Sequence, residues 1–104
     1  MAHYFISRHI GAVQWFKQQG IEIKQHYPHC SDISIFKKDD VVYGNLPIHL
    51  VGILTKHGAR YFNLVLDVPS QLRGKELTGA DFEKCNPRFI EYKVFAKNTM
   101  DVVK

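Results

Sequence analysis

The feature of this sequence that most constrains its fold is a pair of short apolar segments, residues 41–44 and 60–66, on either side of a helical pattern. Both segments are rich in β-branched and aromatic residues, and such compact runs are typical of strands buried on both faces of a sheet. Between them, residues 45–57 place Leu50 and Leu54 at helical spacing. Two buried strands joined by a helix indicate a parallel pair with a crossover connection.

Further segments extend this alternation of strand and helix along the chain. Asn45 is expected to cap the central helix, and Thr78 with Asp81 matches a capping box at the start of a later helix. The expected strands are residues 4–7, 21–25, 41–44, 60–66 and 90–96, and the expected helices are residues 12–19, 45–57 and 79–85. We therefore predict one domain over residues 1–104, an α/β fold of three layers with an open, mostly parallel, Rossmann-like sheet and helices on both faces. Residues 21–25 and 90–96 are expected at the sheet edges.

Cationic residues outnumber acidic residues, with 14 Lys and Arg against 10 Asp and Glu and a formal net charge of +4. They are scattered along the chain, which favours a pocket for a compact anion over a groove for a long nucleic acid. The two cysteines, Cys30 and Cys85, lack the spacing of a zinc site or a disulfide framework, so reduced thiols in a cytoplasmic protein are expected. No apolar segment has the length of a signal peptide or of a membrane span.

Polar, cationic and glycine residues follow three of the expected strands. In an open parallel sheet, ligands bind beyond the carboxyl ends of the strands, so these residues are the candidates for ligand binding. They are Ser7, Arg8, His9 and Gly11 after the first strand, Gly44, Asn45 and His49 after the third, and Asp67, Arg73, Gly74 and Lys75 after the fourth. Taken alone, each of these residues has an interpretation without function, as part of a solvated turn, as a strand terminus or as a surface histidine. Their convergence at one edge favours a site, where helix N-termini also attract anions.

Sequence signatures of other bound groups are missing. His26 and His29 form a pair that metals can use, but no carboxylate or thiolate at a recognised spacing accompanies them, so we expect no metal. The sequence has neither a G-x-x-x-x-G-K nor a G-x-G-x-x-G motif, so no nucleoside triphosphate or dinucleotide cofactor is expected. The polar connection at residues 67–77 is a candidate lid.

Four motifs occur in a characteristic order: Tyr-Phe-Ile-Ser-Arg-His-x-Gly-Ala at residues 4–12, Gly-Asn-Leu-Pro-Ile-His at 44–49, Gly-Ala-Arg-Tyr at 58–61 and Arg-Gly-Lys-Glu-Leu at 73–77. This series resembles a small CRISPR-associated family that accompanies type III systems and is similar to a minimal CARF domain. The resemblance implies a homodimeric ring nuclease that binds a cyclic oligoadenylate and degrades it to switch off type III signalling. The expected ligand is cyclic tetra-adenylate. The resemblance also implies that the ribose 2′-hydroxyl attacks its own phosphodiester, which needs no metal.

The residue chemistry fits this expectation in outline. Arg8, Arg73 and Lys75 suit the phosphates of a ring, and the Asn45 amide suits an adenine edge. His9 or His49 is expected to transfer protons, and Arg8 or Lys75 to stabilise the charge of the transition state. Two alternatives remain open: a protein that sequesters the ring without cutting it, and an interaction protein whose basic loops contact a CRISPR complex or RNA.

Overall fold

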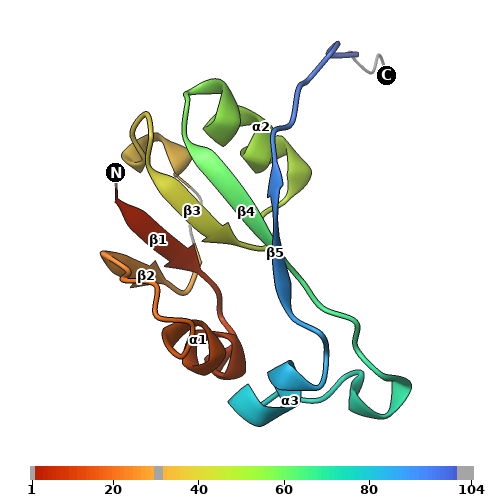
Figure 1. Ribbon diagram of the computed structural model, residues 1–104. Helices are drawn as coiled ribbons and strands as arrows, with labels where there is room; N and C mark the ends of the chain where they lie inside the picture. Colours follow the sequence, from red (N-terminus) through yellow and green to blue (C-terminus); the bar gives the residue numbers. More distant parts are fainter. Residues whose placement is uncertain (1, 30–31, 101–104) are drawn as a thin grey trace.

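The computed structural model describes residues 2–29 and 32–100, which form a five-stranded sheet (Figure 1). The strands are β1 (His3–Ile6), β2 (Gln25–Tyr27), β3 (Val41–Gly44), β4 (Arg60–Val65) and β5 (Arg88–Tyr92). They lie in the order β2-β1-β3-β4-β5, with β1 to β4 parallel and β5 antiparallel to β4. The mostly parallel, open sheet that the sequence predicts is therefore confirmed.

Helices cover both faces of this sheet. On one face, α1 (Ile10–Lys17) packs against α3 (Gly79–Glu83), and on the other lie α2 (Ile48–Lys56) and the 3-10 turn η1 (Ile33–Ile35). Because side chains alternate along a strand, β3 contributes to both hydrophobic cores. The α1-face core comprises Phe5, Ala12, Trp15, Phe16, Val41, Tyr43, Leu64 and Phe82, and the α2-face core comprises Ile6, Ile33, Phe36, Val42, Val51, Leu54, Ala59 and Tyr61. The sheet and the helices on its two faces form the three layers that the sequence predicts.

The edge strands differ most from the prediction. The strand expected at residues 21–25 lies at Gln25–Tyr27, where it pairs with Tyr4, Phe5 and Ile6 of β1. Ile21 and Ile23 instead pack against the α1-face core from an irregular segment, so their alternation reflects burial without strand pairing. The last strand begins at Arg88 and ends at Tyr92, earlier than expected. It is antiparallel to β4, and Tyr92 pairs with Tyr61 near the start of β4, where the pairing ends.

The two expected helix caps have different outcomes. Asn45 does not cap α2, because the N-cap is Pro47 and the Asn45 Nδ2 donates instead to the Leu64 carbonyl at 2.7 Å. The capping box of α3 is confirmed: the Thr78 hydroxyl accepts from the Asp81 amide, and the Asp81 carboxylate accepts from the Thr78 amide. Asn45 thus links the end of β3 to the end of β4.

The helices within residues 2–29 and 32–100 are all too short or too polar to cross a membrane. Cys85 is fully buried, and Cys30 lies outside the described residues.

Candidate ligand-binding site

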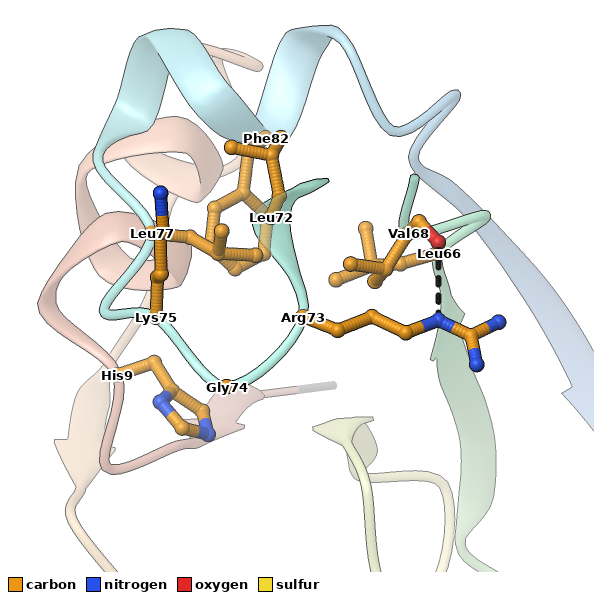
Figure 2. A pocket seen from close by; sticks show the side chains of 9 residues that line it. All are labelled: His9, Leu66, Val68, Leu72, Arg73, Gly74, Lys75, Leu77 and Phe82. Atoms are coloured by element: carbon orange, nitrogen blue, oxygen red, sulfur yellow. Dashed lines mark hydrogen bonds between the residues drawn. The ribbon is translucent and has the colours of Figure 1, made fainter. Parts of the chain in front are cut away.

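Two cavities lie at the carboxyl edge of the parallel strands. The first, here called the polar cavity, has a volume of about 510 Å³ and is lined by Ile6, Ser7, Arg8, His9, Pro28, His29, Asn45, Leu46, Pro47 and Leu50. The second, here called the apolar cavity, has a volume of about 500 Å³ and is lined by His9, Leu66, Val68, Leu72, Arg73, Gly74, Lys75, Leu77 and Phe82 (Figure 2). His9 belongs to both linings, so it lies where the two cavities approach each other.

The end of β1 is fixed through Ser7. Its backbone N–H donates to the Tyr27 carbonyl at 3.0 Å, and its own carbonyl accepts from the His26 Nε2–H at 2.7 Å. Its hydroxyl oxygen accepts from the His9 backbone N–H at 3.2 Å. Ser7 therefore has a positioning role, and the exposed side chains of Arg8 and His9 extend from a constrained turn.

The N-terminus of α1 begins directly after this turn. His9 is the N-cap residue in an extended conformation, its side chain makes no capping hydrogen bond, and the first turn contains no acidic residue. The first N–H groups of a helix lack partners within the helix and carry partial positive charge. The start of α1 therefore adds to the positive potential next to the polar cavity.

The turn after β3 is organised by the buried Tyr61 hydroxyl. This hydroxyl accepts from the Leu46 backbone N–H at 2.9 Å. Two acceptors lie within reach of its single proton, the Asn63 Oδ1 at 2.6 Å and the Gly44 carbonyl at 2.9 Å. Burial raises the pKa of Tyr61, so the neutral, donating form is favoured. The network places Asn45 and Leu46 in the lining of the polar cavity.

Two glycines that the sequence indicates as ligand-binding make internal contacts instead. A Cβ atom at Gly11 would overlap the Leu77 carbonyl oxygen, and one at Gly44 would clash with the Ile6 carbonyl oxygen. Both glycines are buried, and neither lines a cavity. At Gly11, the group that lies against the backbone is the chain's own Leu77 carbonyl.

Asp67 also makes contacts within the chain. Its carboxylate accepts from Asn86 at 3.2 Å and pairs with Arg88 at 3.2 Å, and these hydrogen bonds lower its pKa. Its backbone N–H donates to the Cys85 carbonyl at 2.7 Å. Asp67 therefore anchors the beginning of the 67–77 connection and lines neither cavity.

The far end of the 67–77 connection forms the cationic rim of the apolar cavity. The Arg73 Nε–H donates to the Val68 carbonyl at 3.4 Å, and Gly74 has a φ of +77°, a left-handed conformation that favours glycine. Figure 2 shows His9 facing Gly74 across this rim, with Lys75 next to it. Arg8, His9, Arg73, Gly74 and Lys75 are thus brought together at one edge.

His49 lies elsewhere. It is exposed in the first turn of α2 and lines neither cavity, although its neighbours Pro47 and Leu50 line the polar cavity. The structure places His29 in that lining instead. His29 follows β2, so the rule of strand ends would have indicated it if the edge strand had been placed correctly. The partner histidine of the suspected metal pair, His26, is bonded to the Ser7 carbonyl.

The apolar lining formed by Leu66, Val68, Leu72 and Phe82 was not among the predicted site residues. Three of these residues are half-buried, and a signal was present in the sequence: apolar residues recurring within an otherwise polar connection. In residues 2–29 and 32–100, no group of three or more His, Cys, Asp and Glu side chains gathers around a common metal position.

One protein family matches almost the whole of this chain. No curated protein and no solved structure matches the chain. The protein family described as "Putative CRISPR-associated protein (Cas_VVA1548)" matches residues 4–95, a span that includes every residue lining the two cavities. By this match, the chain belongs to that CRISPR-associated family.

Proposed function

We propose that this protein binds a cyclic oligoadenylate, cyclic tetra-adenylate in the first instance, at the carboxyl edge of its sheet and cleaves it to end type III CRISPR signalling. The observation that carries the proposal is the pair of neighbouring cavities that share His9 in their linings. Each has the volume of a small-molecule site, about 300–1,000 Å³. A ligand with repeated base and phosphate groups would use both cavities at once.

The charge of the two linings supports an anionic ligand. Arg8, Arg73 and Lys75 are the charged residues that line them, and no carboxylate of the described residues does so. Phosphate oxygens accept charge-assisted hydrogen bonds from arginine and lysine, and the start of α1 adds backbone donors. Membership of a CRISPR-associated family is consistent with a ligand that belongs to CRISPR signalling.

The proposed cleavage is an internal transfer. The ribose 2′-oxygen forms a bond to the adjacent phosphorus, the bond from phosphorus to the 5′-oxygen breaks, and the products carry a 2′,3′-cyclic phosphate and a 5′-hydroxyl. A base removes the proton from the 2′-hydroxyl, and an acid protonates the leaving 5′-oxygen. Alignment by the cavity and charge stabilisation by Arg8 or Lys75 lower the barrier.

Two imidazoles line the polar cavity, which matches the need for one base and one acid. His9 and His29 are both in this lining, whereas His49 is outside it. We therefore assign proton transfer to His9, with His29 as its partner. The sequence alone left His9 and His49 as alternatives.

The proposed assembly is a homodimer. A four-nucleotide ring has two-fold symmetry, so two chains related by the same axis would contact it from both sides through identical carboxyl edges. Analytical ultracentrifugation with the bound ring tests this assembly. A complex containing a single chain would contradict it.

The test of the function is incubation of the purified protein with cyclic tri-, tetra- and hexa-adenylate, with and without a chelator, followed by chromatography of the products. We expect linear products ending in a 2′,3′-cyclic phosphate, formed equally well with the chelator. Tight binding of an intact ring would indicate sequestration instead. Failure to bind any ring would favour an interaction protein that contacts a CRISPR complex or RNA.

A further inference from the structure

We infer that the apolar cavity binds one nucleobase of the ring, while the phosphate attached to that nucleotide lies at the rim formed by His9, Arg73 and Lys75. The inference rests on the proposed function and adds to it a separate site for base recognition. The residues that carry it, Val68 and Leu72 above all, are distinct from those assigned to proton transfer.

The cavity has the form of a slot. Figure 2 shows Leu72, Leu77 and Phe82 on one side of the hollow and Leu66 and Val68 on the other. These five apolar residues form more than half of the nine-residue lining. A flat, weakly polar group such as a nucleobase would contact both sides of such a slot.

Two of the slot residues are not part of the protein's own cores. Leu66 and Leu77 pack against the α1-face core, whereas Val68 and Leu72 belong to neither hydrophobic core of the described residues. Both are nevertheless half-buried within a connection of mostly exposed residues. Their apolar surface is therefore available to a ligand, and covering it would add hydrophobic stabilisation to binding.

The 67–77 connection, which carries most of the slot residues, is anchored at both ends. At its start, the Asp67 backbone N–H donates to the Cys85 carbonyl, and the Asp67 carboxylate pairs with Arg88. At its end, Gly11 of α1 lies against the Leu77 carbonyl, and the capping box fixes Thr78. Because both ends are attached to secondary structure, the distance from the slot to His9 is constrained before a ligand binds.

The rim explains why a nucleotide fits better than a purely apolar ligand. Arg73 is oriented by its hydrogen bond to the Val68 carbonyl, and Lys75 and His9 lie on the other side of Gly74 (Figure 2). An apolar slot next to cationic side chains matches a flat base joined through ribose to a phosphate. An uncharged lipid or an apolar peptide would leave Arg73 and Lys75 without an anionic partner.

Methyl NMR tests the placement of the base directly. The probe is the 2′-deoxy analogue of cyclic tetra-adenylate, which lacks the attacking hydroxyl and is therefore not cut. We expect ring-current shifts at the methyl groups of the aliphatic slot residues, and no comparable shift at Ile53 or Ile90, which are exposed on α2 and β5. Binding of the analogue without shifts at the slot methyl groups would overturn the inference.

A matched pair of substitutions in η2 (Ser70–Leu72) gives a second test. Leu72→Trp fills the slot, whereas Gln71→Trp places the same side chain on an exposed neighbour outside the lining. We expect Leu72→Trp to weaken binding of the analogue by about tenfold or more, as for loss of one stacked base, and Gln71→Trp to leave it nearly unchanged.

The outcomes separate the inference from the function on which it rests. If the parental protein binds the ring and Leu72→Trp binds it equally well, the base slot is wrong and the proposed function stands. If the parental protein binds no ring, the proposed function and the slot are both overturned. Thermal unfolding of each variant confirms that any loss of binding occurs in a folded protein.

Discussion

The two ends of the same sheet both carry hollows, but they differ in charge. At the amino end, a cavity of about 590 Å³ is lined by Ala2, His3, Ile21, Glu22 and Lys24. Its volume is similar to those of the two cavities at the carboxyl edge, but its lining carries one charge of each sign. A hydrogen bond joins the His3 ring to the Tyr43 hydroxyl at 2.9 Å. The carboxyl-edge linings carry cations without carboxylates among the described residues.

Volume does not distinguish the two ends of the sheet, whereas the charge of the cavity lining does. At the amino end, the His3 ring and the Tyr43 hydroxyl are hydrogen-bonded to each other and join the neighbouring strands β1 and β3. At the carboxyl edge, Arg8, His9 and Lys75 surround open space next to the N-terminus of α1. We therefore expect substitutions of the cavity-lining residues at the carboxyl edge to change activity, and substitutions at the amino end to change stability.

The largest expected effect is on catalysis. His9→Ala should lower the single-turnover rate of ring cleavage by about 10² or more, as for loss of a general acid or base. His29→Ala should also slow cleavage, and His49→Ala should leave it within about threefold, because His49 lines neither cavity. His3→Ala, at the amino end, is the control. Equal rates for His9→Ala and the parental protein, with a slow His49→Ala, would reverse the assignment.

The next effect concerns the backbone contact that supports the apolar cavity. Gly11→Ala should reduce the free energy of unfolding by about 1–3 kcal/mol, because the new methyl group overlaps the Leu77 carbonyl. The matched control is Gly52→Ala in α2, where the new Cβ would meet Val94 at an ordinary distance of 3.6 Å.

Gly52→Ala should stabilise the protein by about 0.5–1 kcal/mol, since alanine favours a helix over glycine. Urea denaturation measures both changes. Effects of the same sign at the two positions would contradict the packing described here.

At the amino end, a smaller change in stability is expected. Tyr43→Phe removes the hydroxyl that bonds to His3 and should cost about 1 kcal/mol of unfolding free energy. Ring affinity should not change, because Tyr43 lines neither carboxyl-edge cavity. Denaturation and ring binding on the same variant give both values, and a large loss of affinity would break the distinction between the two ends.

The smallest expected effect is a loss of stability at acidic pH. Hydrogen bonds from Asn86 and Arg88 lower the pKa of Asp67, and the Thr78 backbone N–H lowers that of Asp81. A carboxylate with a lowered folded pKa stabilises the fold above its unfolded pKa, and this contribution is lost as pH falls through the folded value. Unfolding free energy should therefore decline below about pH 4.

Asp67→Asn tests this dependence. The variant should be less stable than the parental protein near neutral pH and should show a shallower decline in acid, because one of the titrating groups is gone. The exposed Asp39→Asn is the control. An unchanged acid profile for Asp67→Asn would show that the Asp67–Arg88 pair contributes nothing to stability.

Much of the fold was predictable because β3 is buried at all four positions and β4 has buried residues on both faces, so both strands appear as compact, mainly apolar runs. The edge strand β2 was not predictable in the same way, since it has only three residues and its position depends on pairing with β1. Because the strand was predicted at residues 21–25, His29 was not recognised as a residue that closely follows a strand. Secondary structure at an edge is decided by its neighbour more than by its own sequence.

The candidate site was predicted in part for a related reason. The rule that ligands bind beyond strand ends indicated Ser7, Arg8, His9 and Asn45, and the structure places all four in one lining. It did not distinguish residues that face a cavity from residues used internally. Gly11 contacts the backbone of Leu77, an approach between segments far apart in sequence that no local pattern encodes.

The most direct test of the central claim is equilibrium binding of the 2′-deoxy analogue of cyclic tetra-adenylate to three proteins: the parental chain, Arg8→Ala and Lys24→Ala. Arg8 lines the polar cavity, and Lys24 lines the cavity at the amino end. The account predicts that Arg8→Ala weakens binding by about tenfold or more, as for loss of a charge-assisted hydrogen bond, while Lys24→Ala binds like the parental chain. Equal losses at the two ends, or no binding by the parental chain, would contradict it.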